Sequence, residues 1–187
     1  MKEFLKKKFG EERGNELWEK QQKKYDELLA AATPKSKQKQ KVFEEMLLPR
    51  IAMYKTLLEE GFSREDALKF MEDHVVEWCA PDLKKKYEGM DRLPFGFGLF
   101  KFGFTHIVPS SDLWEADIEK GRDAFSVTMK KCFWHDTDVE YGCPEVCRYS
   151  CQCDDITYSD LKHIKYDRTE TLGTGGTCCD FHFSKRK

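Results

Sequence analysis

The hydrophobic periodicity of the chain changes partway along, and this change constrains the fold more than any other feature. In the first part, apolar residues recur at helical spacing, and Val42, Phe43 and Met46 fall on one face of a helix. Ser63, followed by Asp66, is typical of the start of a further helix, because a serine side chain can cap free backbone N–H groups there. The sequence therefore predicts a helical first part.

The last third shows the twofold alternation of strands instead. Residues 124–134 and 163–172 alternate, and in "CCDFHF" Phe181 and Phe183 share one face. Between these segments, "CPEVCRYSCQCDDITYSDL" is helix-like. The order of these elements predicts an α+β fold, with N-terminal helices followed by a mostly antiparallel sheet and a cysteine-rich helix packed on it.

Two further segments bear on the domain organisation. The polar run "AATPKSKQKQK", which contains Pro34, is typical of a solvated linker. We therefore interpret residues 1–40 as a helical N-terminal extension and residues 41–187 as one α+β domain. "LPFGFGLFKFGFTH" alternates Phe with Gly, and we interpret it as a loop or an irregular pair of strands.

Charge and hydropathy argue against several classes of protein. The formal net charge is −2 at pH 7, whereas a general nucleic-acid-binding protein is normally strongly basic. The sequence shows neither the apolar segment of a signal peptide nor a run of roughly 18 apolar residues. We therefore expect no nucleic acid, no membrane span and a cytoplasmic, reducing setting. The expected partner is a small molecule, and the presence of a homo-oligomer is left open.

Four of the eight cysteines fall within "GCPEVCRYSCQCDD". On a helix, Cys143, Cys147 and Cys151 lie at positions i, i+4 and i+8 of one face, and Cys153 points away from it. Such neighbours have Cβ atoms about 5–6 Å apart, whereas a disulfide needs about 3.8 Å. Since the setting is expected to be reducing as well, we expect no disulfides.

Metal binding and simple packing are two other interpretations of the cysteines. Cys143, Cys147 and either Cys179 or His182 could form a site for zinc or an iron–sulfur cluster. Free cysteine is also among the most frequently buried residue types and is then often inert. The sequence leads us to assign neither a metal nor a cofactor.

Cys151 differs from the other cysteines because acidic residues follow it one helical turn later. Asp154 and Asp155 prolong the face on which Cys151 lies. Arg168 and His182 are candidates for lowering the pKa of its thiol. A thiol, an acid and a cation are the groups that nucleophilic catalysis by cysteine requires.

Several short motifs resemble one protein family in their order and spacing. "C-x-x-D", from Cys151 to Asp154, is followed by "DRTETL", a glycine-rich turn and "CDFHF". Upstream, "LPRIAMYKTLLEEGFSREDA" is similar to a helical segment of the same family. Together these motifs resemble the L-2-amino-thiazoline-4-carboxylic acid hydrolase family over about residues 42–184.

The resemblance implies a hydrolase acting on carbon–nitrogen bonds in cyclic amidines. Its substrate would be a cyclic isothiourea such as L-2-amino-thiazoline-4-carboxylate, opened to an N-carbamoyl amino acid. Cys151, Asp154 and Asp155 are implied as catalytic residues. Cys151 would attack as a thiolate, or water would attack with an aspartate as base, and both mechanisms stay open.

The resemblance also implies a substrate-binding set, in which an arginine guanidinium matches the two oxygens of the substrate carboxylate. This set consists of Arg168, Thr169, Thr171, Cys179, Asp180 and His182. An alternative interpretation comes from a different class of protein. It is a non-catalytic domain of the same fold that binds a small ligand or a metal, either zinc or an iron–sulfur cluster.

Overall fold

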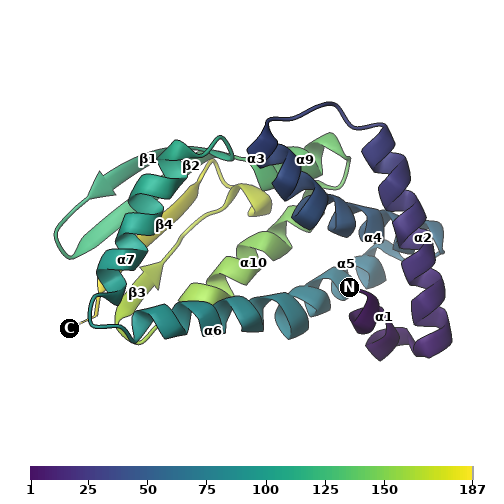
Figure 1. The fold of residues 1–187 in the computed structure, drawn as a ribbon, viewed down its shortest axis with the longest axis horizontal. Helices are drawn as coiled ribbons and strands as arrows, with labels where there is room; N and C mark the ends of the chain where they lie inside the picture. Colours follow the sequence, from purple (N-terminus) through teal and green to yellow (C-terminus); the bar gives the residue numbers. More distant parts are fainter. Residues whose placement is uncertain (187) are drawn as a thin grey trace. The chain divides into compact units, whose positions relative to one another are not determined.

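Helices make up the first part of the chain (Figure 1). The computed structural model describes residues 1–186, and the chain forms two compact units, Met1–Trp78 and Cys79–Lys187. The elements of the first unit are α1 (Lys2–Phe9), α2 (Glu11–Ala30), α3 (Lys37–Val42), the π-helical turn η1 (Phe43–Leu47), α4 (Leu48–Glu59) and α5 (Arg64–His74). The π-helical turn η2 (Val75–Cys79) follows α5.

The first unit confirms the predicted helices and one predicted helix start. Ser63 Oγ accepts a hydrogen bond of 3.0 Å from the Asp66 N–H and so caps α5. The division into residues 1–40 and residues 41–187 stays a prediction. Lys187, the last residue of the predicted domain, lies outside the described residues.

The second unit combines helices with a four-stranded sheet. Its helical elements are α6 (Ala80–Asp91), α7 (Gly96–Phe102), the π-helical turn η3 (Gly103–Ile107), α8 (Val108–Ser110), α9 (Phe133–Glu140), the 3-10 turn η4 (Pro144–Val146), α10 (Cys147–Tyr158) and the 3-10 turn η5 (Leu172–Thr174). Its strands are β1 (Trp114–Lys120), β2 (Ala124–Cys132), β3 (Ile164–Asp167) and β4 (Cys179–Lys185). The strand order is β1-β2-β4-β3, and all neighbours are antiparallel, which confirms the predicted α+β class.

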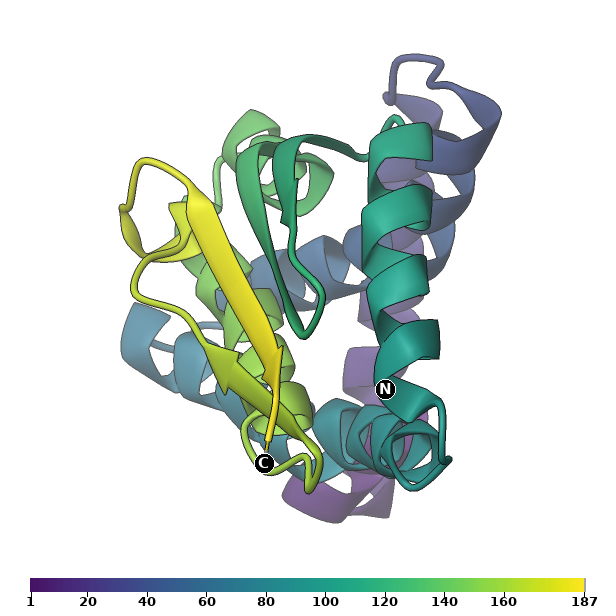
Figure 2. The same ribbon diagram turned by 90° about the vertical axis from the view of Figure 1, so that its left-hand side faces the viewer.

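One face of this sheet carries the core of the second unit. Phe125 and Val127 of β2 lie beside Phe181 and Phe183 of β4, and all four side chains are buried together with residues of α7 and α10. Figure 2 shows α10 behind β3 and β4, on the side of the sheet that this core occupies. The alternate residues, such as His182, point to the opposite face.

The prediction for the Gly/Phe segment is wrong, because this segment is helical in α7 and η3. Phe97, Phe100 and Phe104 recur at helical spacing and pack against the core, whereas Phe102 points outward and is 58% exposed. The alternation of Gly with Phe mimics a strand. The apolar contacts that decide the structure nevertheless recur every three to four residues, as in a helix.

Strand β1 is an element that was not predicted from the sequence. Its alternate residues Trp114, Ala116 and Ile118 pack against the core of the second unit. Its antiparallel pairing with β2 breaks register between Glu115 and Ala116. Within residues 1–186, no helix is both long and apolar enough to cross a membrane.

Candidate active site

Helix α10 presents two cysteines on one face. Cys147 and Cys151 lie one helical turn apart, and both are buried. Asp154, near the next turn, keeps 40% of its side chain exposed. Cys143 does not belong to this helix, contrary to the prediction. Pro144, which has no backbone N–H, instead begins the separate turn η4.

The connection from β3 to β4 passes directly over the two thiols. A Cβ atom built on Gly173 would lie 2.9 Å from Cys151 Sγ and 3.1 Å from Cys147 Sγ. Since a real side chain does not tolerate such distances, glycine allows this close approach of the backbone. The Thr171 side chain and the Gly173 backbone hydrogen-bond to Cys151.

Asp180 holds this connection in place. Its Oδ1 accepts hydrogen bonds from the backbone N–H groups of Thr169 (2.9 Å) and Glu170 (2.8 Å). Its Oδ2 accepts one from Thr169 Oγ1 at 2.6 Å. Burial acts to raise the pKa of Asp180, but the hydrogen bonds from Thr169 and Glu170 lower it overall. The two predicted substrate-binding residues Thr169 and Asp180 thus bind each other.

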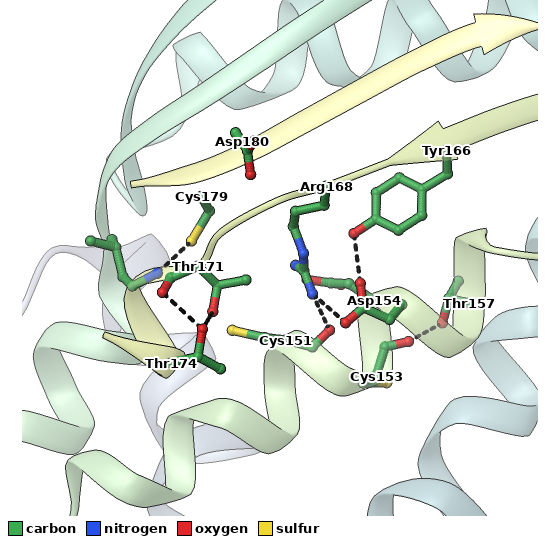
Figure 3. Close-up of polar contacts among 12 residues, drawn as sticks. Cys151, Cys153, Asp154, Thr157, Tyr166, Arg168, Thr171, Thr174, Cys179 and Asp180 are labelled. Carbon is green, nitrogen blue, oxygen red and sulfur yellow. Dashed lines mark hydrogen bonds and ion pairs between the residues drawn. The ribbon is translucent and has the colours of Figure 1, made fainter. Parts of the chain in front are cut away.

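Arg168 connects this segment to α10 (Figure 3). Its side chain is 4% exposed, and Nη2 donates a 2.8 Å hydrogen bond to the Cys151 carbonyl. Nη2 also lies 2.7 Å from Asp155 Oδ2. Nη1 lies 3.7 Å from Asp154 Oδ2 and, although it is buried, has no hydrogen-bond partner among residues 1–186. The guanidinium stacks over the Phe181 ring, 5.1 Å from its centroid.

The surroundings of Cys151 favour its thiolate. A hydrogen bond from the Cys147 thiol has the largest effect and lowers the pKa of Cys151. Burial acts in the opposite direction, while the Thr171 hydrogen bond and the Arg168 charge lower the pKa further, to about 6. A free cysteine has a pKa of about 8.5. The thiol of Cys151 is therefore more acidic than that of a free cysteine, which favours its thiolate form at neutral pH.

The two aspartates of α10 have different environments. Asp155 accepts a 2.9 Å hydrogen bond from Tyr166 and pairs with Arg168, so both of its oxygens have partners. Although 40% of the Asp154 side chain is exposed, desolvation by the surrounding protein raises its pKa to about 7, while the nearby Arg168 acts to lower it. Asp154 can therefore donate or accept a proton near neutral pH.

The last two predicted substrate-binding residues lie on opposite faces of β4. Cys179 points to the core side, where its Sγ accepts a 3.3 Å hydrogen bond from the Leu172 N–H, and burial raises its pKa to about 11. His182 is half exposed on the other face and lies 2.9 Å from Ser126 Oγ. The structure thus brings Cys179 toward Cys151 but keeps His182 away from it.

The cysteines form neither disulfides nor a metal cluster in the part of the chain that the structure describes. All eight lie in this part, and none of them is in a disulfide. Within residues 1–186, no group of three or more His, Cys, Asp and Glu side chains is arranged to hold a metal ion. The geometry therefore gives no support to the set of Cys143 and Cys147 with Cys179 or His182.

Three residues of this site were not among the predicted site residues. Gly173 lies within the glycine-rich turn, and Tyr166 alternates with Ile164 along β3, so both positions carried a local signal. Cys147 was interpreted either as a metal ligand or as a small buried residue. Its spacing of four residues from Cys151 was the signal that it shares the face of the thiol.

One comparison with known proteins gave a match. The model of the family described as L-2-amino-thiazoline-4-carboxylic acid hydrolase matches residues 39–183. No curated protein and no solved structure gave a significant match. The matched range includes α10, the connection over its thiols and β4 up to Phe183.

Proposed function

The chain belongs to the L-2-amino-thiazoline-4-carboxylic acid hydrolase family, and on this premise we propose that it opens the ring of a small cyclic isothiourea. The proposed reaction converts L-2-amino-thiazoline-4-carboxylate and water to N-carbamoyl-cysteine. The observation that carries the proposal is the position of Arg168, whose charge lowers the pKa of the Cys151 thiol and whose buried Nη1 lies 3.7 Å from the Asp154 carboxyl. These groups supply a nucleophile, a proton carrier and a carboxylate-binding cation.

Atom balance refines the predicted reaction class. The product keeps both nitrogens of the isothiourea on the former ring carbon and gains a free thiol. The bond that breaks is therefore the ring carbon–sulfur bond, and the oxygen of water replaces the ring sulfur. This differs from the cleavage of a carbon–nitrogen bond that the resemblance implied.

In the first step, the Cys151 thiolate attacks the carbon that lies between the two nitrogens and the ring sulfur of the protonated, cationic isothiourea. The ring carbon–sulfur bond breaks, and protonated Asp154 donates a proton to the departing sulfur. The product of this step is an isothiouronium group bonded to Cys151 Sγ. A cysteine with a lowered pKa suits this step, because the thiolate is the nucleophilic form.

In the second step, the Asp154 carboxylate accepts a proton from water, which attacks the same carbon. Cys151 departs as a thiolate, and the remaining proton is released with the urea product. A carboxyl with a pKa of about 7 suits both steps, because it is protonated for the first and ionised for the second. Asp155 transfers no proton in this scheme, because its two oxygens are bound to Tyr166 and Arg168.

Arg168 binds the substrate carboxylate in this proposal. Within residues 1–186, its Nη1 is a buried donor without a hydrogen-bond partner, and leaving such a donor unsatisfied is costly. A carboxylate that approaches from the side of Asp154 would satisfy it. Protonated Asp154 carries no charge that would repel this carboxylate.

A ring-opening assay tests the proposed function. Purified, reduced protein is incubated with L-2-amino-thiazoline-4-carboxylate, the product is identified by mass spectrometry, and the released thiol is measured with a colorimetric thiol reagent. We expect N-carbamoyl-cysteine and one free thiol for each substrate molecule consumed. Unchanged substrate with folded protein would remove this substrate from the proposal.

A further inference from the structure

The two thiols of α10 contact the same residue of the β3–β4 connection. Gly173 lies against both, since a Cβ atom on it would be 2.9 Å from Cys151 Sγ and 3.1 Å from Cys147 Sγ. The two side chains are one helical turn apart on one face, and their sulfurs are hydrogen-bonded to each other. When one of the two thiols is ionised, the other can therefore hold the single remaining proton between the two sulfurs.

The groups around the pair decide which sulfur holds this proton. Hydrogen bonds from Thr171 and the Gly173 backbone, together with the charge of Arg168, favour an anion at Cys151. The hydrogen bond between the two thiols has the largest effect against an anion at Cys147, followed by burial, and the charges of Cys151 and of the fully buried Asp138 add to it. Cys147 lies at the N-terminus of α10, where the helix dipole favours an anion, but the negative charge of Asp138 counteracts this effect.

We propose that Cys147 is a positioning residue, whose thiol donates a hydrogen bond to Cys151 Sγ and so keeps Cys151 in the thiolate form. The catalytic meaning of this pair rests on the proposed function. While Cys151 is bonded to the substrate carbon, its sulfur carries no charge and the hydrogen bond is weak. When Cys151 departs as a thiolate, the hydrogen bond from Cys147 is strong again, and the proton stays on Cys147 throughout.

Other titratable groups face the pair from neighbouring elements. Burial raises the pKa of Cys132 at the end of β2 to about 12 and the pKa of Cys179 on β4 to about 11, so both stay neutral at pH 7. Asp154 on α10 changes its charge near pH 7. These three residues are unchanged in every variant compared below. A difference in the pH midpoint between variants is therefore due to the substitution of Cys147.

The test measures the ionisation of Cys151 without any substrate. The rate of its alkylation by iodoacetamide is followed by peptide mass spectrometry as a function of pH, and thiolate absorbance is compared with that of Cys151→Ala. We expect the wild-type rate to rise with pH, with a midpoint near 6. Removing a donor destabilises the thiolate, so we expect the midpoint in Cys147→Ala and Cys147→Val to rise by about one pH unit or more.

Cys147→Ser is the matched variant that keeps a donor. Its hydroxyl can donate to Cys151, so we expect a midpoint within about half a pH unit of the wild-type value. Cys147→Val is the second variant without a donor, and it leaves no cavity if the smaller alanine destabilises the fold. The proposal would be overturned if the alanine or valine variant had the wild-type midpoint. It would also be overturned if the midpoint rose equally in the alanine, valine and serine variants. Since no substrate is used, failure of the ring-opening assay does not affect this result.

Discussion

Replacement of Cys151 by alanine is expected to lower kcat for ring opening by at least about 10³-fold. The substitution removes the nucleophile, and the remaining groups can only assist direct attack by water. Cys151→Ser is expected to fail as well, because a serine hydroxyl, unlike this thiol, stays protonated at neutral pH unless a base removes its proton. The measurement is product formation by mass spectrometry under saturating substrate.

Cys153→Ala is the matched control for this experiment. Cys153 lies on the same helix and is half-buried, and it has no role in the proposed steps. We expect its turnover to stay within about twofold of wild type, since substitutions away from the site cost little. Thermal unfolding of each variant checks that the fold is kept. Turnover of Cys151→Ala near the wild-type rate would exclude covalent catalysis by Cys151.

Replacement of Arg168 by lysine is expected to lower kcat/KM by about 10²-fold. Lysine keeps the positive charge but loses the fork that reaches the Cys151 carbonyl, Asp155 and the substrate carboxylate together. A hydrogen bond to a charged group contributes about 1.5–3 kcal/mol, and about 1.4 kcal/mol corresponds to a factor of ten. We expect most of the loss in KM, because the carboxylate is bound in both the ground state and the transition state.

Arg148→Lys is the control for this substitution. Arg148 is an exposed residue of the same helix, and the change in side-chain chemistry is identical. We expect kcat and KM close to wild type. Equal kinetics for Arg168→Lys and wild type would show that Arg168 does not bind the substrate carboxylate. A fall in unfolding temperature alone, with kcat/KM unchanged, would leave Arg168 a structural role.

The parts of the fold that follow from local pattern were predictable from the sequence. The alternation of Phe181 and Phe183 predicted strand β4, and the capping pattern at Ser63 predicted the start of α5. The Gly/Phe segment was not predictable in the same way. Alternate glycines offer no side chain to either face, so the sequence pattern could not distinguish the helical period of Phe97 and Phe100 from that of a strand.

The arrangement of the site residues on α10 was predictable from the sequence, but their contacts with the β3–β4 connection were not. The spacing of Cys151 and Asp154 places both near one face of a helix, whatever the rest of the chain does. The approach of Gly173 to the thiols depends on where the β3–β4 connection folds, which tertiary contacts decide. The partners of Asp180 depend on the same connection, so its contact with Thr169 could not be read from the motif.

Trapping of the covalent intermediate tests the central claim most directly. Asp154→Asn can neither donate a proton to the departing sulfur nor accept one from water. Because the ring sulfur can depart as a thiolate without a proton, the second step should slow more than the first, and the intermediate on Cys151 should accumulate. The variant is mixed with L-2-amino-thiazoline-4-carboxylate, quenched in acid at a series of times, and its peptides are analysed by mass spectrometry. We expect a substrate-derived mass on Cys151 that decays as product forms. Product formation without this mass on Cys151 at any time, in the variant and in wild type, would contradict nucleophilic attack by Cys151.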